Sequence, residues 1–453
     1  MTDEVKMIFA LVLFLATYVL LLLLPKYRAY IALATAVVFV AARVMTAGHI
    51  VTLDWIPNWN VLMMIAGTMG IVSLFIESKM PALLADLIID KMPNVKWATL
   101  ALSLFAGLIS AFVDNVATVL MVAPVAVTIA KKLKISPVNM VIAIAISSNL
   151  QGAATLVGDT TSILLGAEAK MNFAHFFFFR INESSALRPS LFWICQAGAL
   201  ASALILLFLF RKDKQPIHME EKTQVTDYVP SVLLLGTIVL LIIASFLPIP
   251  EKLRDAIPIN GIICMTLFLI GLVRNLAKRR DIVKTLKEVD GFTLLLLFSL
   301  FVIIGGIEEA GIIDKISMII QHISAGNLFV IFTILCWISV AFSAVIDNIP
   351  YVMTMLPVVT MLANSMSPTG QDTEGIRFVM YFGLVVGATL GGNLTPIGAS
   401  ANIAGIGILR KEGHEVSVRQ FMRISVPFTL AAVITGYILV WLLFKPAGFS
   451  WFG

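Results

Sequence analysis

Long apolar runs dominate the chain, and short polar stretches separate them. Residues 7–24, 191–210 and 427–444 are apolar at nearly all of their 18 to 20 positions. A helix needs about 20 consecutive apolar residues to cross the hydrocarbon core of a bilayer. About a dozen such segments follow one another along the chain. The pattern predicts an all-α polytopic membrane protein.

Two of the apolar segments are too long for a single crossing and carry a carboxylate near the middle. Residues 97–133 contain the pair Asp114–Asn115, and a similar stretch surrounds Asp347–Asn348. We expect the first to form a re-entrant helix over 97–113, a turn at the Asp-Asn pair and a second helix from near Val116. The Asp would cap the N-terminus of that second helix. Irregular backbone at membrane depth must face protein or a water-filled cavity.

The two Asp-Asn pairs belong to a longer duplication. Three matched stretches occur in the same order in both halves, at separations that drift slowly. The matched residues are Glu77 with Glu308, 231 residues apart; Asp114 with Asp347, 233 apart; and Thr155 with Thr395 and Gly158 with Gly398, 240 apart. Duplication with interrupted apolar segments at matching places is typical of secondary transporters. The chain is therefore expected to contain two structural repeats.

The duplication also predicts how the chain is divided. The expected parts are an N-terminal transmembrane helix (1–28), a first repeat (29–210), a cytoplasmic loop with a linking helix (211–257) and a second repeat (258–453). The most basic loops, 211–228 and 274–290, are separated by two apolar segments. An even number of crossings places both loops on one side, and the positive-inside rule makes that side the cytoplasm.

A second interruption in each half is rich in glycine. Residues 147–162 and 387–402 split apolar segments with two or more glycines each. Weakened helices free backbone carbonyl and N–H groups that can bind ions or substrate. The binding candidates in these stretches are Asn149, Thr155, Gly158, Asp159, Asn393, Thr395 and Asn402. A neutral polar residue in a membrane helix more often bonds a neighbouring helix, whereas an intramembrane carboxylate marks a functional pathway by default.

Charge narrows the choice of cargo. Charged residues make up 13% of the chain, about half their share in soluble domains. The segments that carry the candidates contain no Lys or Arg, namely 97–130, 138–169, 328–376 and 378–409. An anion there would meet three Asp, while a cation or a neutral species fits more easily. A carboxylate that holds Na⁺ and H⁺ in turn would exchange one ion for the other.

The cysteines, the histidines and the net charge give no indication of a disulfide-linked, metal-binding or nucleic-acid-binding protein. Cys195, Cys264 and Cys336 all lie in apolar spans, and the five His are scattered. The sequence therefore offers neither a disulfide framework nor a paired metal-ligand spacing. The net charge of +5 follows from basic loops and indicates no nucleic-acid partner. The expected partners are the lipid bilayer and a small inorganic ion or small anion, and a homodimer is left open.

Four stretches resemble the ArsB/NhaD group of the ion transporter superfamily. They read "SAFVDNVATVLMVAPVAV", "GAATLVGD", "SAVIDNIPYVMTMLPVV" and "GGNLTPIGASANIAGIGILRKEG". That group contains arsenite efflux permeases, NhaD-type sodium/proton antiporters and the melanosomal P protein, with citrate and dicarboxylate carriers as more distant relatives. The resemblance implies two inverted-topology repeats, each contributing a re-entrant helical hairpin and a broken transmembrane helix to a midplane site.

The resemblance also implies site residues. Those at the hairpin tips are Asp114, Asn115, Thr118, Asp347 and Asn348, and those in the broken helices are Gly158, Asp159, Asn393, Thr395 and Asn402. One departure concerns the first broken helix. It reads "GDTTS" where relatives similar to the P protein have Gly-Asp-Pro-Pro-Asn, which leaves the local backbone and the identity of the substrate open.

Together these features predict a secondary active ion transporter coupled to Na⁺ or H⁺, and not an enzyme. The favoured form is sodium/proton antiport by alternating access at a midplane site. No cofactor is expected beyond a coupling Na⁺, with Asp114, Asn115, Asp347 and Asn348 as its candidate ligands. The alternative is a cation-coupled permease for arsenite, antimonite or a citrate- or dicarboxylate-type anion.

Two other classes fit less well. An intramembrane aspartyl protease would use two Asp that share a proton, in Gly-x-Gly-Asp and Tyr-Asp contexts. Here Asp114 follows Phe-Val and Asp347 follows Val-Ile. A passive channel would not accumulate its ion against a gradient in vesicles, which a coupled transporter does.

Overall fold

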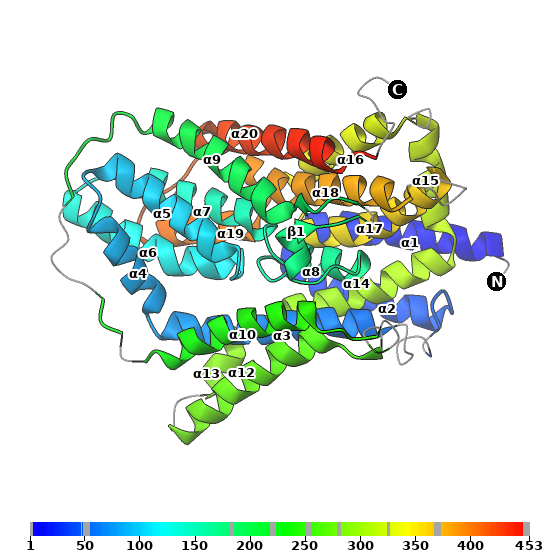
Figure 1. Ribbon diagram of the computed structural model, residues 1–453. Helices are drawn as coiled ribbons and strands as arrows, with labels where there is room; N and C mark the ends of the chain where they lie inside the picture. Colours follow the sequence, from blue (N-terminus) through cyan, green and yellow to red (C-terminus); the bar gives the residue numbers. More distant parts are fainter. Residues whose placement is uncertain are drawn as a thin grey trace.

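The computed structural model describes residues 3–46, 48, 55–181, 185–217, 223–225, 227–250, 253, 256–278, 282–323, 327–366 and 373–446. Within these ranges the protein is mostly helical, with one antiparallel pair of two-residue strands, β1 (Phe178–Phe179) and β2 (Arg188–Pro189). Ten of the described helices are long and apolar enough to cross a membrane. The expected all-α polytopic fold is confirmed (Figure 1).

The helices fall into two successive sets. The first set is α1 (Asp3–Leu23), η1 (Pro25–Tyr27), α2 (Arg28–Ala41), α3 (Ile56–Glu77), α4 (Met80–Ile89), α5 (Val95–Ser110), α6 (Asn115–Leu133), α7 (Val138–Gly152), α8 (Thr160–Glu168), η4 (Ala174–Phe176) and α9 (Leu191–Leu209). The second is α10 (Val229–Phe246), α12 (Ile259–Ala277), α13 (Ile282–Glu288), α14 (Gly291–Glu309), α15 (Ile312–Ile323), α16 (Leu328–Ser343), α17 (Asn348–Met366), α18 (Thr373–Gly391), η5 (Gly392–Leu394), α19 (Ser400–Lys411) and α20 (Val418–Phe444).

The order of helices in the first half recurs in the second. From α3 to α9 and from α14 to α20, the chain runs through a long helix, a short helix, a hairpin, a central helix, a break with a short helix, and a final long helix. Contacts between the halves are reciprocal, since α2 packs on α14 while α12 packs on α3, and α9 packs on α20. Exchanged contacts of this kind indicate a pseudo-two-fold relation. The inversion of one repeat relative to the other, and the repeat boundaries, stay predictions.

The predicted hairpins are present, with small shifts at their ends. The first consists of α5 and α6, the second of α16 and α17. α5 and α16 have 16 residues each, or about 24 Å at 1.5 Å per residue, which is short of the roughly 30 Å hydrocarbon core. α5 begins at Val95 and not at 97, and α6 begins at Asn115, one residue before the predicted start. Their lengths suit helices that enter the membrane and turn back.

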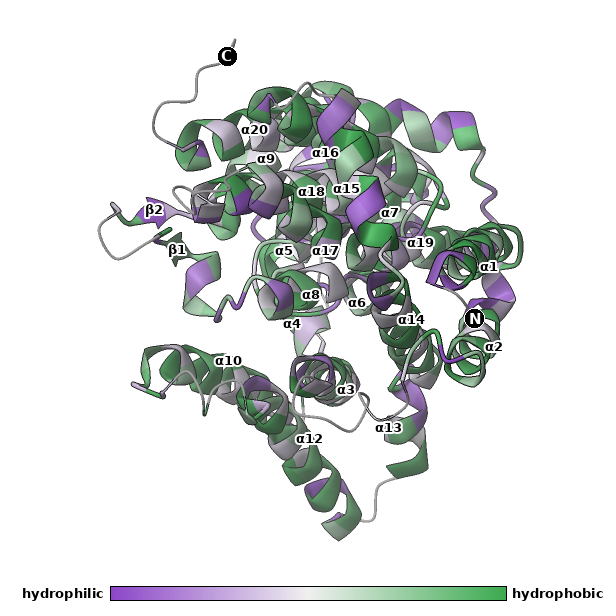
Figure 2. Cartoon of the chain, turned by 90° about the vertical axis from the view of Figure 1, so that its right-hand side faces the viewer, coloured by the Kyte–Doolittle hydropathy of each residue, from purple (hydrophilic) through white to green (hydrophobic). Residues whose placement is uncertain are grey.

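The two helices that precede the glycine-rich interruptions form the centre of the molecule. α7 and α18 are buried on almost every side. α7 ends at Gly152, and α8 starts only at Thr160; α18 ends at Gly391, and α19 starts at Ser400. The first break, residues 153–159, is buried throughout, as unpaired carbonyl and N–H groups at membrane depth require. The second break is less enclosed, since Ile397 leaves 66% of its surface exposed. Figure 2 shows α3, α10 and α12 grouped on one side of the hairpin helices.

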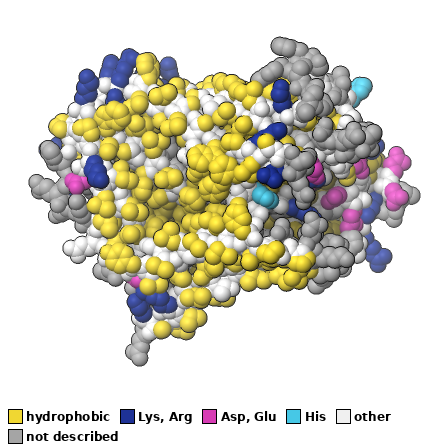
Figure 3. Space-filling view, viewed as in Figure 1, with side chains coloured by type: hydrophobic (Ala, Val, Ile, Leu, Met, Phe, Trp, Pro, Cys, Tyr) yellow, Lys and Arg dark blue, Asp and Glu magenta, His cyan; other side chains and the backbone are white. Residues whose placement is uncertain are grey.

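The outer surface matches a bilayer. The face drawn in Figure 3 is apolar across its middle, and charged side chains gather toward its two ends. Leu204 on α9 and Phe246 on α10 leave 67% and 75% of their surfaces exposed. Large apolar side chains exposed over such a wide band are stable against lipid tails but not against water. The membrane therefore surrounds the middle of the molecule.

The two predicted basic loops lie on the same side of the molecule. Arg274, near the end of α12, donates from Nη1 to Asp227 Oδ2 at 3.0 Å and from Nη2 to Asp227 Oδ1 at 2.7 Å. Asp227 directly precedes Tyr228 and α10, so this ion pair joins one loop to the other. In Figure 1 the chain that follows α9 and the segment around α13 are both found at the left. The shared side is confirmed, and its cytoplasmic location stays a prediction.

Cysteine labelling would test that location. Because the three native cysteines are buried, a membrane-impermeant maleimide should give little background. If the loops face the cytoplasm, Lys212→Cys and Lys278→Cys will react only after the membrane is opened. Met318→Cys, exposed on α15 at the other end of the molecule, will react in intact cells. Reaction of all three in intact cells would contradict the predicted orientation.

Candidate ion-binding site

Both hairpin tips line one cavity, as the duplication predicts. The cavity has a volume of about 280 Å³ and is bounded by the two tips, the first turns of α8 and α19, and parts of α3 and α14. The predicted site residues that line it are Asp114, Asn115, Asn149, Asp159, Asp347 and Asn348. The fold thus brings together predicted residues from three apolar segments, two in the first half of the chain and one in the second.

The first tip presents a partly satisfied carboxylate. Asp114 caps α6, and its Oδ1 accepts hydrogen bonds from the backbone N–H groups of Val116 at 3.0 Å and Ala117 at 3.1 Å. Helix N-termini stabilise negative charge in this position. Among the described residues, none donates a hydrogen bond to its second oxygen, Oδ2. This tip therefore combines a negative charge with an oxygen that a ligand could use.

A second carboxylate caps the neighbouring helix. Asp159 Oδ1 accepts from the N–H of Thr160 at 2.7 Å, and its Oδ2 from the hydroxyl of Thr161 at 3.3 Å. The side chain is largely buried, and it lines the same cavity as Asp114 and Asp347. Three carboxylates thus line one cavity of about 280 Å³. Like charges so close favour a bound cation or proton among them.

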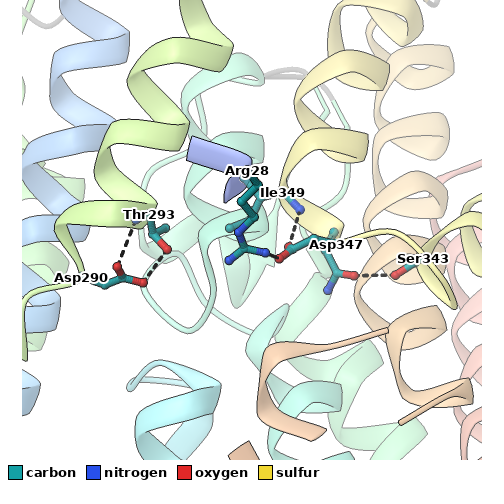
Figure 4. A network of polar contacts seen from close by, with 7 residues as sticks. Arg28, Asp290, Thr293, Ser343, Asp347 and Ile349 are labelled. Carbon is teal, nitrogen blue, oxygen red and sulfur yellow. Dashed lines mark hydrogen bonds and ion pairs between the residues drawn. The ribbon is translucent and has the colours of Figure 1, made fainter. Parts of the chain in front are cut away.

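The second tip is paired with an arginine that the sequence analysis missed. Arg28, the first residue of α2, donates from Nη1 to Asp347 Oδ2, and the N–H of Ile349 donates to Asp347 Oδ1 at 3.3 Å (Figure 4). The four segments that contain the predicted residues lack basic residues, but this guanidinium enters from a fifth. Arg28 follows Lys26 by two residues at the start of an apolar span, where an arginine is usually taken to extend toward the membrane surface.

One end of the cavity carries further acidic groups. Asp290 caps α14, and its Oδ1 accepts from the N–H groups of Phe292 and Thr293, each at 3.1 Å, while its Oδ2 accepts from the Thr293 hydroxyl at 2.6 Å. Asp290 and Glu288 are both exposed at this end. In all, five carboxylates and one guanidinium line the cavity. Its formal charge is strongly negative.

Buried amides connect the two halves behind the tips. Asn115 donates to Asn149 Oδ1 at 2.9 Å, and Asn149 donates to Asn393 Oδ1 at 3.1 Å and to the Thr389 carbonyl at 2.8 Å. Asn393 donates in turn to the Ile146 carbonyl at 2.8 Å. Satisfied buried networks of this kind fix the relative position of the groups that form them. Asn393 therefore supports the site from behind and does not line the cavity.

Matching hydroxyls fasten each tip to its broken helix. Thr155 donates to the carbonyl of Ala111 in the first tip, and Thr395 donates to the carbonyl of Ala344 in the second. Neither Thr155 nor Thr395 lines the cavity, and the same is true of Gly158 and Thr118. The geometry gives the two threonines a structural role at least, since each joins elements of its own repeat.

Two predicted residues keep buried oxygens without partners. Thr118 Oγ1, in the first turn of α6, and Asn402 Oδ1, in the first turn of α19, form no hydrogen bond among the described residues. The Asn402 amide nitrogen is satisfied, because it donates to the carbonyls of Gly392 and Thr395, both at 3.1 Å. An unpaired buried oxygen is costly unless a water or an ion fills the place of the missing partner.

The duplicated hairpins, the broken helices and the acidic cavity between them define a multi-pass membrane transporter. Comparison with known families narrows this class, because residues 18–383 match the citrate transporter family, CitMHS. The chain belongs to this family and is placed in the cell membrane. The sequence resemblance had pointed to the ArsB/NhaD group, with citrate carriers as more distant relatives. The family match instead places the chain among the citrate transporters. The narrower likeness to arsenite permeases and NhaD antiporters stays a prediction.

Similar proteins cover most of the chain. An uncharacterized transporter of Synechocystis sp. is 27% identical over 91% of this chain and 94% of its own length. An uncharacterized transporter of Mycobacterium tuberculosis is 28% identical over 96% and 97%. The P protein of Sus scrofa is 24% identical over 96% of this chain and 60% of its own length. The expected similarity to the P protein is confirmed.

Solved transporters share the fold. The YdaH transporter of Alcanivorax borkumensis superimposes with a TM-score of 0.56 and 14% identity, over 86% of this chain and 87% of its own. MtrF of Neisseria gonorrhoeae, described as belonging to a class of antimetabolite efflux pumps, gives 0.52 and 16%, over 90% and 84%. At these identities the similarity concerns the fold alone.

Proposed function

We propose that this transporter couples the movement of its cargo to Na⁺ or H⁺ at the cavity between the hairpin tips, with sodium/proton exchange as the favoured form. The observation that carries the proposal is the excess of five carboxylates over one guanidinium around the cavity. A cation lowers the repulsion among these groups, whereas an anion alone would add to it. Because one carboxylate cannot hold Na⁺ and H⁺ at the same time, competition between the two ions is sufficient for exchange.

The ligand set favours a monovalent ion. Among the described residues, no group of three or more His, Cys, Asp and Glu side chains is arranged to hold a metal ion. A cation near Asp114 would therefore be held by few carboxylate oxygens together with neutral oxygens. Such a set suits Na⁺ better than a divalent ion, which usually takes several carboxylate oxygens.

Two hollows at opposite ends of α14 support alternating access. The cavity with the tips includes Asp290 and Thr293 at the start of this helix. A second hollow of about 610 Å³ includes Glu308 and Glu309 at its end, and none of the three site Asp residues lines it. The site is therefore associated with one hollow in this structure. Alternating access would open the site to the second hollow in another state.

A cation-coupled anion carrier is the second candidate, and two observations favour it. The matched family is described as citrate transporters, and Arg28 supplies donors that suit a carboxylate. Ser400, at the N-terminus of α19, also lines the cavity, and helix N-termini attract anions. In this form a cation at the first tip would accompany a citrate- or dicarboxylate-type anion. Arsenite and antimonite are the remaining alternative cargoes.

Transport by purified protein in liposomes that contain a pH-sensitive dye tests the proposal. With a proton gradient imposed, external Na⁺ should collapse the gradient in wild type but not in Asp114→Asn or Asp347→Asn. If Na⁺ moves no protons, exchange is ruled out, and uptake of labelled citrate, dicarboxylates and arsenite with Na⁺ or H⁺ as driver decides the second candidate. Unchanged transport in both variants would contradict the proposal in either form.

A further inference from the structure

The two halves of the cavity match in backbone but differ in charge. The first repeat supplies Asp114 and Asp159, and no basic side chain among the described residues forms an ion pair with either. In the second repeat, the residue that matches Asp159 at the 240-residue separation is Ala399, and Asp347 is paired with Arg28. At the tips and broken helices, the first repeat therefore carries two formal negative charges that are not balanced, and the second carries none. The other two carboxylates of the second repeat, Glu288 and Asp290, are exposed at one end of the cavity.

The same carboxylate oxygen is open at one tip and filled at the other. At both tips Oδ1 accepts backbone N–H groups from the first turn of the following helix. Oδ2 of Asp347 accepts the Arg28 guanidinium, whereas none of the described residues donates a hydrogen bond to Oδ2 of Asp114. At the second tip the guanidinium thus occupies a position that is open at the first.

A buried hydroxyl group also has no partner at the first tip, whereas the matching hydroxyl at the second tip has one. Thr118 Oγ1, four residues after Asp114, is fully buried and has no partner among the described residues. The matching residue in the second repeat, 233 positions on, is Tyr351, whose hydroxyl is 3.1 Å from Ser339 Oγ. Only the first of these matched positions leaves an oxygen without a partner.

We propose that Arg28 acts as a permanent cation at the second tip, so that the exchangeable cation binds at the first tip alone. The inference rests on the proposed function and deepens it. A guanidinium stays charged at every physiological pH, and Arg28 belongs to α2, outside the hairpin, so it is not released with the cargo. Although each repeat has a tip, the transporter would then bind one exchangeable cation per cycle and not two. Arg28 would therefore determine the stoichiometry of cation binding.

Charge-balanced variants in the liposome assay give the first test. Asp347→Asn alone leaves the Arg28 charge unbalanced near the site, so Na⁺-driven proton movement should fall at least ten-fold. Adding Arg28→Gln to Asp347→Asn removes that charge and should recover at least half of the lost rate. If the double variant stays as inactive as Asp347→Asn while remaining folded by gel filtration, Asp347 itself holds exchangeable cation and the inference is wrong.

The number of bound cations gives a second test that does not depend on transport. The melting temperature of detergent-solubilised protein is measured against NaCl, with choline chloride keeping the ionic strength constant. Stabilisation grows with the number of ions bound to the folded state, so the dependence on log [Na⁺] should be about twice as steep in Arg28→Gln as in wild type. Arg28→Lys keeps the charge and should behave as wild type, as should Lys26→Gln, an exposed neighbour.

The outcomes separate this inference from the proposal beneath it. Equal slopes in wild type and Arg28→Gln would overturn the role of Arg28 and leave cation coupling intact. If the only defect of Arg28→Gln were a raised KM for citrate, the role of Arg28 would also be overturned, because Arg28 would then be an anion ligand. If Na⁺ and H⁺ have no effect on wild-type transport or stability, the proposed function fails, and the inference fails with it.

Discussion

Asp114→Asn is expected to reduce cation-coupled transport at least 100-fold while leaving the protein folded. The two effects separate because Asn caps helices about as well as Asp, so the hydrogen bonds from Val116 and Ala117 can be kept. What the variant loses is the negative charge and an anionic oxygen at the first tip. The rate of Na⁺-driven proton movement in liposomes measures the loss, and the melting temperature measures folding.

Asp290→Asn is the matched control for this prediction. Asp290 also caps a helix and lines the same cavity, but it is exposed at one end. Removal of its charge should change transport by no more than about three-fold, since charges exposed to water are strongly screened. Comparable losses in Asp114→Asn and Asp290→Asn would mean that the overall field of the cavity matters, and not a specific site at the tip.

Gly158→Ala and Gly398→Ala are expected to damage the structure itself. A Cβ at each position would lie 2.6, 2.8 and 2.9 Å from three backbone carbonyl oxygens; those near Gly158 belong to Gly152, Ala111 and Ser110, and those near Gly398 to Gly392, Ser343 and Ala344. Backbone atoms cannot move aside as the end of a flexible side chain can. Overpacking of this kind costs about 1–3 kcal/mol, and here it would also push each tip away from its broken helix.

Each of these two variants should therefore have a lower melting temperature and little transport activity. Gly407→Ala is the control, because it lies on α19 and a Cβ there meets no atom within 4 Å. Alanine is the better helix former, so this variant should be as stable as wild type or slightly more. If Gly158→Ala kept wild-type stability and transport, the close packing of the tip against the broken helix would not be required for either.

The architecture could be predicted from the amino-acid sequence, because the features that define it are local or repeated. The lengths of the apolar runs predict the spans, and the Asp-Asn pairs predict where α6 and α17 begin to within one residue. Gly152 and Gly391 end α7 and α18 where the glycine-rich stretches predict a break. The duplication can be recognised without related sequences, because both copies lie in one chain and their matched residues are separated by nearly constant distances in sequence.

The charge of the site and the role of each residue in it could not be predicted in this way, because they depend on how distant helices pack. Arg28 reaches Asp347 across 319 residues, through the packing of α2 against the second half, which no local pattern specifies. Asp290 joins the cavity in the same way, from the start of α14. Thr155, Thr395 and Asn393 look like ligands in sequence, but hold backbone or amide groups behind the cavity. A polar residue's type shows what it can bind, whereas its partner depends on how helices far apart in the chain pack together.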